Sequence, residues 1–224
     1  MLTSNKHSGP EAFQQVLDTQ IANFGSARVF GLLRSGRLQL SHYHSLLLTL
    51  FHQTQSSPYT FATAAANCTW THETIKEYLL CHAEEERTHW RWVIDDLRTS
   101  GYAGPDPRSC FPHPSCEAYI SFNERIAHRQ PVARLAIASV LEGIGAHFGA
   151  TYGHELLKAL RLPREHATFF LSHGETDKRH ANELRAVIAQ AQLNSGEWAW
   201  MTHCAAVAGS LYRNMYDHEA FQSA

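Results

Sequence analysis

Two segments of the chain, HAEEERTH at residues 82–89 and HGETDKRH at residues 173–180, repeat one spacing of histidines and carboxylates. Each has a histidine, a carboxylate four residues later and a second histidine three residues after that: His82, Glu86 and His89 in the first, and His173, Asp177 and His180 in the second. Steps of four and seven residues turn an α-helix by about 400° and about 700°, so such side chains lie within roughly 40° of one another. The spacing therefore predicts two helices, each with two imidazoles and one carboxylate on one face.

The length of each segment predicts a site for two metal ions. Its three side chains extend over about 10 Å of helix axis, which is too far for one ion to bind all of them easily. Two adjacent ions could each take one end and share the middle carboxylate. Imidazole with carboxylate oxygen suits iron, manganese or zinc, and iron is favoured because di-iron helical bundles use Glu-x-x-His pairs such as Glu86-x-x-His89.

A third carboxylate, Glu142, lies in the apolar sequence SVLEGIGAHFG at residues 139–149. Burying a carboxylate without a partner costs several kcal/mol, so we expect Glu142 to be a bridging or terminal metal ligand from a third helix. The alternative is that one or both segments lie on solvated faces, with residues 84–87 as a charged surface run. Glu85 could also replace Glu86 as the ligand, although the match to the second segment favours Glu86.

A stripe of small residues follows Glu142 on the same predicted helix. Gly145, Gly149 and Gly153 share one face, where glycine is unfavourable by up to about 1 kcal/mol relative to alanine. The stripe indicates either a substrate pocket at Gly145 and Gly149 or close packing of a neighbouring helix. His147 and His154 lie on other faces and are expected to be structural or exposed.

Composition limits the class of protein. The chain has 224 residues, 44% of them hydrophobic, and a formal charge of −2, which suits one domain and gives no basic surface for nucleic acid. We expect a flexible tail at residues 1–10 and a single helical domain at 11–224. No secretory signal and no run of about 18 apolar residues is apparent, so we expect a soluble, cytoplasmic protein without membrane contact. Five scattered cysteines without a Cys-x-x-Cys pair suit reduced structural thiols.

Apolar residues recur at intervals of three and four nearly throughout, which predicts an all-α fold. We expect helices at residues 11–34, 40–54, 58–68, 72–99, 114–129, 131–159, 163–192 and 196–219. Ser100 to Pro114, rich in proline, glycine and aspartate, is expected to be a surface loop.

With these motifs in this order, the chain resembles the haem-oxygenase-like di-iron oxidases and oxygenases, a family with a bundle of seven to eight helices. The resemblance covers nearly the whole helical length and rests on His89, Glu142 and the set His173, Asp177 and His180. It departs at position 82, where many members have glutamate and this chain has histidine. Either His82 replaces that ligand, or Glu86 takes its role.

The resemblance implies an oxidoreductase with two Fe(II)/Fe(III) ions, O2 as co-substrate and, depending on the reaction, an external electron donor. Glu142 and Asp177 would be the catalytic carboxylates, changing their binding mode as the irons change charge. The substrate would be a small molecule, often an amino acid or fatty acid of specialised metabolism. The most specific expectation is conversion of a brominated tryptophan to a nitrile.

Three other expectations remain open. Arg125, Arg134 or Arg213 could hold a substrate carboxylate, and the aromatic C-terminal helix could mediate a homodimer. A true haem oxygenase needs a histidine on its first helix, which the helix from Glu11 lacks. A cofactor-free, thiaminase-like relative leaves the two motifs unexplained, whereas a non-catalytic metal-binding or interaction protein is compatible with the sequence.

Overall fold

The computed structural model describes residues 9–221, and all regular secondary structure in this range is helical. Ten α-helices occur there: α1 (Pro10–Phe24), α2 (Arg28–Arg34), α3 (Leu40–Asn67), α4 (Glu73–Glu86), α5 (Trp90–Thr99), α6 (Pro114–Arg129), α7 (Arg134–Ile144), α8 (Ala150–Leu160), α9 (Thr168–Gln190) and α10 (Ser195–Asn214). A short turn separates α4 from α5, and a π-helical segment (Gly145–Gly149) joins α7 to α8. Counting each of these pairs as one rod gives eight, so the predicted all-α bundle is confirmed.

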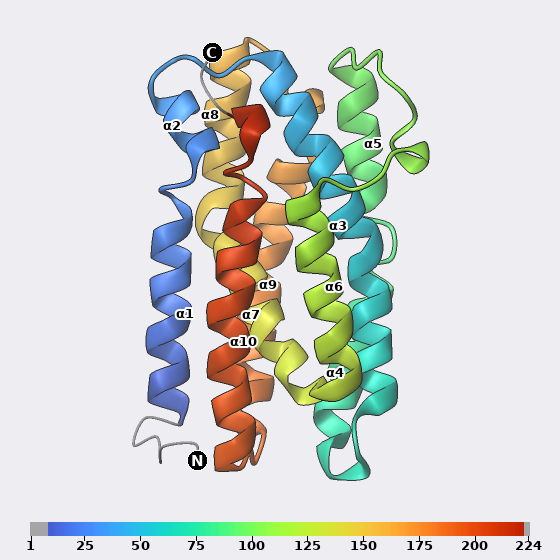
Figure 1. Cartoon of the computed structure of the whole chain (residues 1–224), viewed down its shortest axis with the longest axis vertical. Coiled ribbons are helices and arrows are strands. Elements are labelled where there is room, and N and C mark those ends of the chain that lie inside the picture. Colours follow the sequence, from blue (N-terminus) through green and yellow to red (C-terminus); the bar gives the residue numbers. More distant parts are fainter. Residues whose placement is uncertain (1–8, 222–224) are drawn as a thin grey trace.

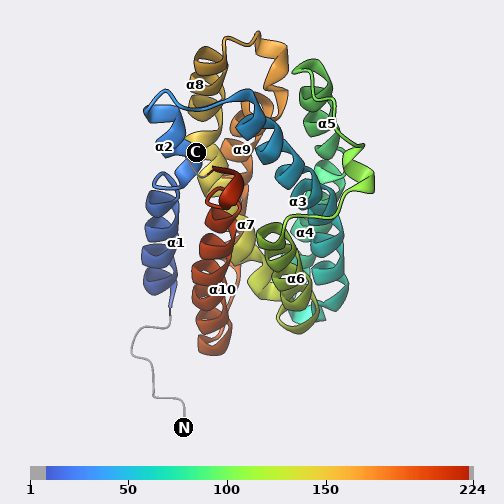
Figure 2. The same cartoon turned by 45° about the horizontal axis from the view of Figure 1, so that its top comes forward.

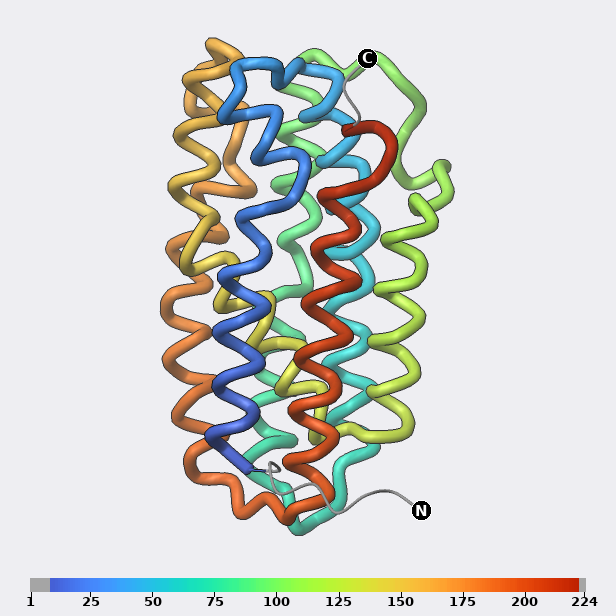
Figure 3. The backbone as a smooth tube through the Cα atoms, turned by 60° about the vertical axis from the view of Figure 1, so that its left-hand side comes forward, coloured from blue at the N-terminus to red at the C-terminus, as the bar shows by residue number. Residues whose placement is uncertain are grey.

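The helices form a bundle whose interior contains α7 (Figure 1). On one side α3 packs against α4, α5 and α6, and on the other side α10 packs against α1. Figure 3 shows α1 and α10 running side by side along the front of the bundle. Helix α7 contacts both α10 and α9. The tilted view of Figure 2 shows α10 in front of α7 and α9.

The central position of α7 follows from its composition, because a helix that is apolar on all sides is stable only when other elements surround it. Leu135, Ile137 and Val140 are fully buried, although they point in different directions around the helix. The run Pro131–Leu160 is apolar and long enough to span a membrane by composition, but 61% of its most apolar window is buried inside the bundle. The expectation that no stretch reaches this apolarity is therefore wrong, and a core helix accounts for the run.

Two predicted boundaries in the first quarter of the chain are wrong. The helix predicted at 11–34 ends at Phe24 and restarts at Arg28, which folds α2 back so that Phe30 packs edge-on against Phe24 with ring centroids 5.3 Å apart. The helices predicted at 40–54 and 58–68 are one helix, α3, with Pro58 inside it. Pro58 removes one backbone donor, but α3 packs along its length against α4, α5 and α6, and this tertiary packing outweighs the local cost.

Later boundaries differ for reasons that concern the site. The helix predicted at 72–99 is interrupted by a turn at residues 87–89, so the first motif does not lie on one face of one helix. The helix predicted at 131–159 contains the π-helical segment, and the one predicted at 163–192 starts as an α-helix at Thr168. The last helix ends at Asn214 instead of 219. The loop predicted from Ser100 to Pro114 is confirmed, with one 3-10 turn at Pro107–Ser109.

The predicted N-terminal tail falls mostly outside the described residues. Residues 1–8 are not described, and Pro10 already belongs to α1, one residue before the predicted start of the domain.

A buried carboxylate on α5 fixes the start of α9. Asp96 is fully buried and accepts hydrogen bonds from the backbone N–H groups of Thr168 and Phe169, at 2.8 and 2.9 Å. The first N–H groups of a helix lack partners within it, and a carboxylate also interacts favourably with that end of the helix dipole. Asp96 therefore positions the helix that carries the second motif.

Replacing Asp96 with alanine should lower the free energy of unfolding by about 2–3 kcal/mol, because two buried N–H groups would lose a charged acceptor. Urea unfolding at pH 8, above the pKa of about 6 to which burial raises Asp96, measures this loss. The neighbouring Asp95 is exposed and pairs only with exposed Arg98, so Asp95→Ala is the control and should change stability by less than about 0.5 kcal/mol. Equal effects of the two substitutions would contradict the anchoring role of Asp96.

Candidate metal centre

The bundle brings the seven predicted metal ligands together in its interior. They come from α4 and the turn after it, from α7 and from α9: His82, Glu86, His89, Glu142, His173, Asp177 and His180. Six of them are buried and His173 is half-buried, so the alternative that the motifs lie on solvated faces is wrong.

Glu86 lies between two pairs of histidines. Its carboxylate forms one group with His82 and His180 and a second group with His89 and His173, and in each group the candidate ligand atoms lie within 4.8 Å of one another. Oε1 is 3.7 Å from His180 Nδ1, whereas Oε2 is 2.9 Å from His89 Nδ1. The two oxygens of one carboxylate thus face two different ligand groups, which is the arrangement expected of a shared ligand.

His89 ends the turn at residues 87–89, and its side chain reaches back to Glu86. The His89 N–H donates to the Glu86 carbonyl at 3.2 Å, a contact three residues apart that tightens the chain just after α4 ends. The sequence prediction placed Glu86 and His89 three residues apart on one continuous helix, where such side chains are also neighbours. In the structure their side chains meet across the end of α4.

Glu142 faces the first histidine pair from α7. Its Oε1 is 3.2 Å from His82 Nε2 and its Oε2 is 3.2 Å from His180 Nδ1. Glu142 also forms a ligand-type group with Asp177 and His180. The lone carboxylate of the apolar helix therefore has the partners that its burial requires.

Asp177 has two relationships within the cluster. Its Oδ1 is 2.9 Å from His173 Nδ1, so it can orient that imidazole while Nε2 faces Glu86, 3.7 Å from its Oε2. A histidine that ligates a metal commonly holds a carboxylate with its other nitrogen in this way. Asp177 thus differs from Glu86, although the two motifs have the same spacing.

The donor set fits a cation. Among residues 9–221, the buried atoms His82 Nε2 and Glu86 Oε1 have no hydrogen-bond partner, which is costly unless something else uses their lone pairs. Both lie in the ligand group that also contains His180. A mixed nitrogen and oxygen set without sulfur suits iron, manganese or zinc.

The carboxylates and imidazoles of the cluster shift one another's pKa values. Burial opposes ionisation of Glu142, but the neighbouring imidazoles of His180 and His82 hold its pKa well below the usual range. Burial also opposes protonation of His173 and His180, yet the neighbouring carboxylates raise their pKa values to about 10 and about 9. Burial raises the pKa of Asp177 to about 7, against the attraction of His173. These side chains therefore hold protons at neutral pH.

Metal binding should release these protons. At pH 7 we expect roughly two protons to leave per chain, because His173 and His180 are protonated without metal and must be neutral to ligate it. The apparent affinity for Zn²⁺ should therefore rise between pH 6 and pH 8 by about tenfold per pH unit for each proton released. Calorimetric titrations in two buffers of different ionisation enthalpy count the protons. Binding that releases none, with an affinity independent of pH, would contradict this electrostatic description.

Glu85, the alternative ligand, lies outside the cluster. It is exposed, and its Oε2 accepts from His180 Nε2 at 2.8 Å and from Arg179 at 2.7 Å. His180 is thereby held with Nδ1 toward Glu142. The sequence analysis missed this role of Glu85. The available signal was that Glu85 and Arg179, two residues of opposite charge, each directly precede a predicted ligand, Glu86 and His180.

Aromatic rings cover the histidines. Trp92 stacks on His89 with ring centroids 4.3 Å apart, and Phe61 lies 4.4 Å from His82. Phe169 lies 4.6 Å from His173. These rings restrict the imidazoles and shield them from water. The spacing of the ligand residues in the sequence did not predict these aromatic contacts.

The glycine stripe allows the close packing of a neighbouring helix, one of the two interpretations left open by the sequence. A Cβ at Gly149 would approach Gly174 Cα to 3.0 Å, and one at Gly153 would press on Leu171 at 3.1 Å, so these positions allow close packing of α9. At Gly145 a Cβ would overlap Asp177 Oδ2. Gly145 thus leaves room for a carboxylate of the cluster, in the π-helical segment, a feature frequent at functional sites.

A cavity of about 60 Å³ adjoins the cluster. Gly145 and Gly149, the two residues predicted for a substrate pocket, line it together with cluster residues Glu86, Glu142, His173 and Asp177. The rest of its wall is mainly aromatic, with Phe24, Phe30, Phe61, Phe148, Tyr152, Phe169, Phe170, Tyr212 and Tyr216. Small apolar molecules with a polar end suit such a space.

The three candidate arginines differ in their surroundings. Arg125 is exposed and Arg213 pairs with Asp217 at 3.2 Å. Arg134 is 1% exposed and lines the cavity. Only Arg134 of these three can face a molecule bound there.

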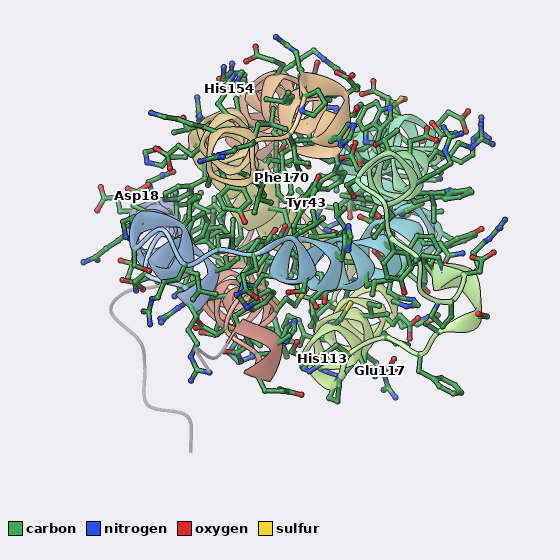
Figure 4. All side chains as sticks on the ribbon, turned by 90° about the horizontal axis from the view of Figure 1, so that it is seen from above. Asp18, Tyr43, His113, Glu117, His154 and Phe170 are labelled. Atoms are coloured by element: carbon green, nitrogen blue, oxygen red, sulfur yellow. The ribbon has the colours of Figure 1, made fainter. Side chains whose placement is uncertain are left out.

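Histidines outside the cluster have other roles. His147 and His154 are exposed, as expected, and Figure 4 shows His154 at the rim of the bundle, away from Tyr43 and Phe170 near its centre. His113, His218 and Glu219 form a further ligand-type group near the surface. In that group His113 Nδ1 accepts from the Ser115 N–H, and its Nε2 lies 3.0 Å from Glu219. The ring nitrogens of His113 are therefore already used.

A family of iron-containing redox enzymes has a model that matches residues 46–208 of the chain. Comparison with curated proteins gave no match. Among solved structures, a domain of unknown function with a haem oxygenase-like fold from Shewanella denitrificans OS217 superposes with a TM-score of 0.81 at 18% identity, over 93% of this chain and 90% of that one.

Two other solved structures superpose over similar lengths. A TenA homologue from P. horikoshii OT3 gives a TM-score of 0.73 at 13% identity, over 92% of this chain and 95% of that one. A haem oxygenase from Leptospira interrogans gives 0.71 at 14% identity, over 92% and 97%. At these identities the likeness shows the fold alone, and it confirms the predicted haem-oxygenase-like bundle.

Proposed function

The chain belongs to the family of iron-containing redox enzymes, and from this premise we propose that it is a non-haem di-iron oxidase that uses O2 to oxidise a small molecule. The observation that carries the proposal is the position of Glu86, whose two oxygens face different histidine pairs. One ion would be held by Glu86 with His82, Glu142 and His180. The other would be held by Glu86 with His89 and His173, and Asp177 would support either position.

Bound ferrous ions would supply the electrons that reduce O2. The chain supplies the surroundings in which this chemistry stays productive. Glu85 holds the tautomer of His180, and Asp177 holds that of His173. Trp92, Phe61 and Phe169 keep bulk water from the imidazoles. Glu142 and Asp177 are the proposed catalytic carboxylates, because both line the cavity where a substrate would lie.

The proposed substrate is an amino acid of specialised metabolism, and the specific candidate is a halogenated tryptophan converted to a nitrile. The aromatic wall of the cavity supports a substrate with an apolar body. The cavity is small, about 60 Å³, so a halogenated indole would require side chains such as Phe148 or Phe170 to move. Smaller amino acids therefore belong in the same trial.

Two alternative functions, a haem oxygenase and a metal-free thiaminase-like enzyme, have less support. Helix α1 contains no histidine that could ligate haem iron. A thiaminase-like reaction would need a reactive cysteine or an organised acid–base pocket without metal, and among the described residues no cysteine lines the cavity. Burial also raises the pKa of Cys116 and Cys204 to about 12, which leaves both as unreactive thiols.

Oxygen uptake distinguishes catalysis from iron storage. The iron-loaded protein should consume O2 repeatedly when a reductant and a substrate are present, and the O2 consumed should match the product formed. Tryptophan, brominated tryptophans and smaller amino acids form the panel, with products identified by mass spectrometry. Uptake limited to the oxidation of bound ferrous iron, whatever the added molecule, would reject the oxidase and favour a non-catalytic iron protein.

A further inference from the structure

Arg134 is a buried cation that contacts no counter-ion among the residues that the structure describes. It is 1% exposed, and among residues 9–221 its Nη1 atom has no hydrogen-bond partner. Its Nε donates to Thr60 Oγ1 at 3.2 Å, and one Nη2 hydrogen reaches Ser57 Oγ at 3.5 Å. A guanidinium has five N–H donors, so most of the donors of Arg134 have no acceptor among the described residues. Buried charges are normally paired, and an exception requires a reason.

The surroundings hold the guanidinium in place without neutralising it. Its central carbon lies 3.7 Å from the centre of the Phe61 ring, a cation–π contact that also fixes the plane of the fork. Burial lowers the pKa of Arg134, and the phenol of Tyr119 and the carboxylate of Glu142 oppose this shift from a distance. The side chain is therefore rigid and charged, with free donors.

The free donors belong to a residue of the cavity wall. Arg134 lines the cavity together with Gln53, Thr54 and Ser57 from α3, which adds polar groups to a wall that is otherwise aromatic. Glu142, which lines the same cavity, follows eight residues later on α7, about 12 Å along the helix axis. The guanidinium and the cluster therefore line two separate parts of one cavity.

The charge of the proposed metal centre favours an anion at this point. Three buried carboxylates, Glu86, Glu142 and Asp177, lie among the histidines of the cluster. Two divalent ions with Arg134 would bring five positive charges against these three negative ones, an excess of two within a low-dielectric interior. A bound carboxylate reduces that excess.

We propose that Arg134 is the specificity-determining residue of the cavity, and that it binds the carboxylate of a small substrate whose apolar body packs on the aromatic wall. A guanidinium forms two parallel hydrogen bonds with a carboxylate, and the unpaired Nη1 supplies one of them. This inference rests on the proposed oxidase function for calling the ligand a substrate, but the anion site itself can be tested without turnover.

Equilibrium binding to the Zn²⁺-loaded, full-length protein tests the site with matched pairs of probes. The pairs are 3-phenylpropionate with 3-phenylpropanol, indole-3-propionate with indole-3-propanol, and L-tryptophan with tryptamine. The wild-type protein should bind the carboxylate of at least one pair about 10- to 100-fold more tightly, as expected for a charge-assisted hydrogen bond. Arg134→Met should abolish this preference, and Arg134→Lys should retain part of it, because lysine keeps the charge but not the fork.

Arg125→Met is the matched control, because Arg125 is an exposed arginine on α6 that does not line the cavity. It should keep the wild-type preference. If Arg134→Met does not fold, as judged by circular dichroism, Ser57→Ala and Arg134→Lys carry the test, and each should weaken carboxylate binding severalfold. No preference for carboxylates in the wild-type protein, or an unchanged preference in the folded Arg134 variants, would overturn the proposal.

The result is separable from that of the proposed function. If the protein binds two irons and consumes O2 but shows no Arg134-dependent preference for carboxylates, only the proposed carboxylate site is rejected. If the protein shows the Arg134-dependent preference but binds no second iron, the di-iron oxidase proposal is rejected and the anion-binding cavity is retained.

Discussion

Replacing Glu142 with alanine should abolish O2-dependent turnover, with a decrease of more than about 100-fold, because even groups that only orient ligands contribute 10- to 100-fold. The substitution leaves His82 Nε2 and His180 Nδ1 without the carboxylate that lies 3.2 Å from each of them. It also removes one of three buried negative charges that would balance the metal ions. The O2 consumption of the iron-loaded variant measures the loss, and its iron content after desalting shows whether the cause is lost metal.

Glu84→Ala is the control for this experiment. Glu84 is exposed and pairs only with exposed Arg87, although it lies two residues before Glu86. Its replacement should leave iron content and O2 consumption unchanged. Turnover that persists in Glu142→Ala would defeat the assignment of Glu142 to the catalytic centre.

Replacing Gly145 with alanine should reduce the iron content from two ions toward one, although alanine favours a helix by about 1 kcal/mol. The new methyl group would overlap Asp177 Oδ2, and the carboxylate must then leave its place beside His173 and Glu142. A methyl group on a helix would thus affect metal binding more than folding. Iron per chain and far-UV circular dichroism, measured on the same sample, separate the two effects.

Gly31→Ala provides the comparison for the effect of helix propensity. Gly31 lies in α2, and a Cβ there would meet no atom within 4 Å. This variant should bind two irons and be as stable as the wild-type protein or slightly more stable. If Gly145→Ala also keeps two irons with unchanged affinity, the space beside Gly145 does not matter for the centre.

The sequence predicted the helical class and which seven residues lie together, because ligand residues at helical spacing leave few other arrangements. It did not predict the turn at residues 87–89, since nothing in Arg87-Thr88-His89 disfavours a helix strongly. At the break His89 stacks on Trp92 and contacts Glu86, and it makes a tertiary contact with His173 of α9. Pro58 shows the opposite case, in which packing maintains a helix that the local sequence would end.

Residues that act through other residues were the hardest to find in the sequence. Glu85 and Asp96 each lie in a charged stretch where a solvated role is the usual one, and only the fold shows that they hold His180 and the start of α9. Arg134 was one of three arginines that the sequence could not distinguish. Burial separates it from Arg125 and Arg213, and burial depends on how α3 and α7 pack.

The central claim is that one chain binds two iron ions that share Glu86. Anaerobic titration with Fe(II), followed by Mössbauer spectroscopy, tests it most directly. The account predicts a breakpoint at two ions per chain and, in Glu86→Ala, a loss of at least one of them. A breakpoint at one ion or none in the wild-type protein would contradict the account and leave a mononuclear or metal-free site.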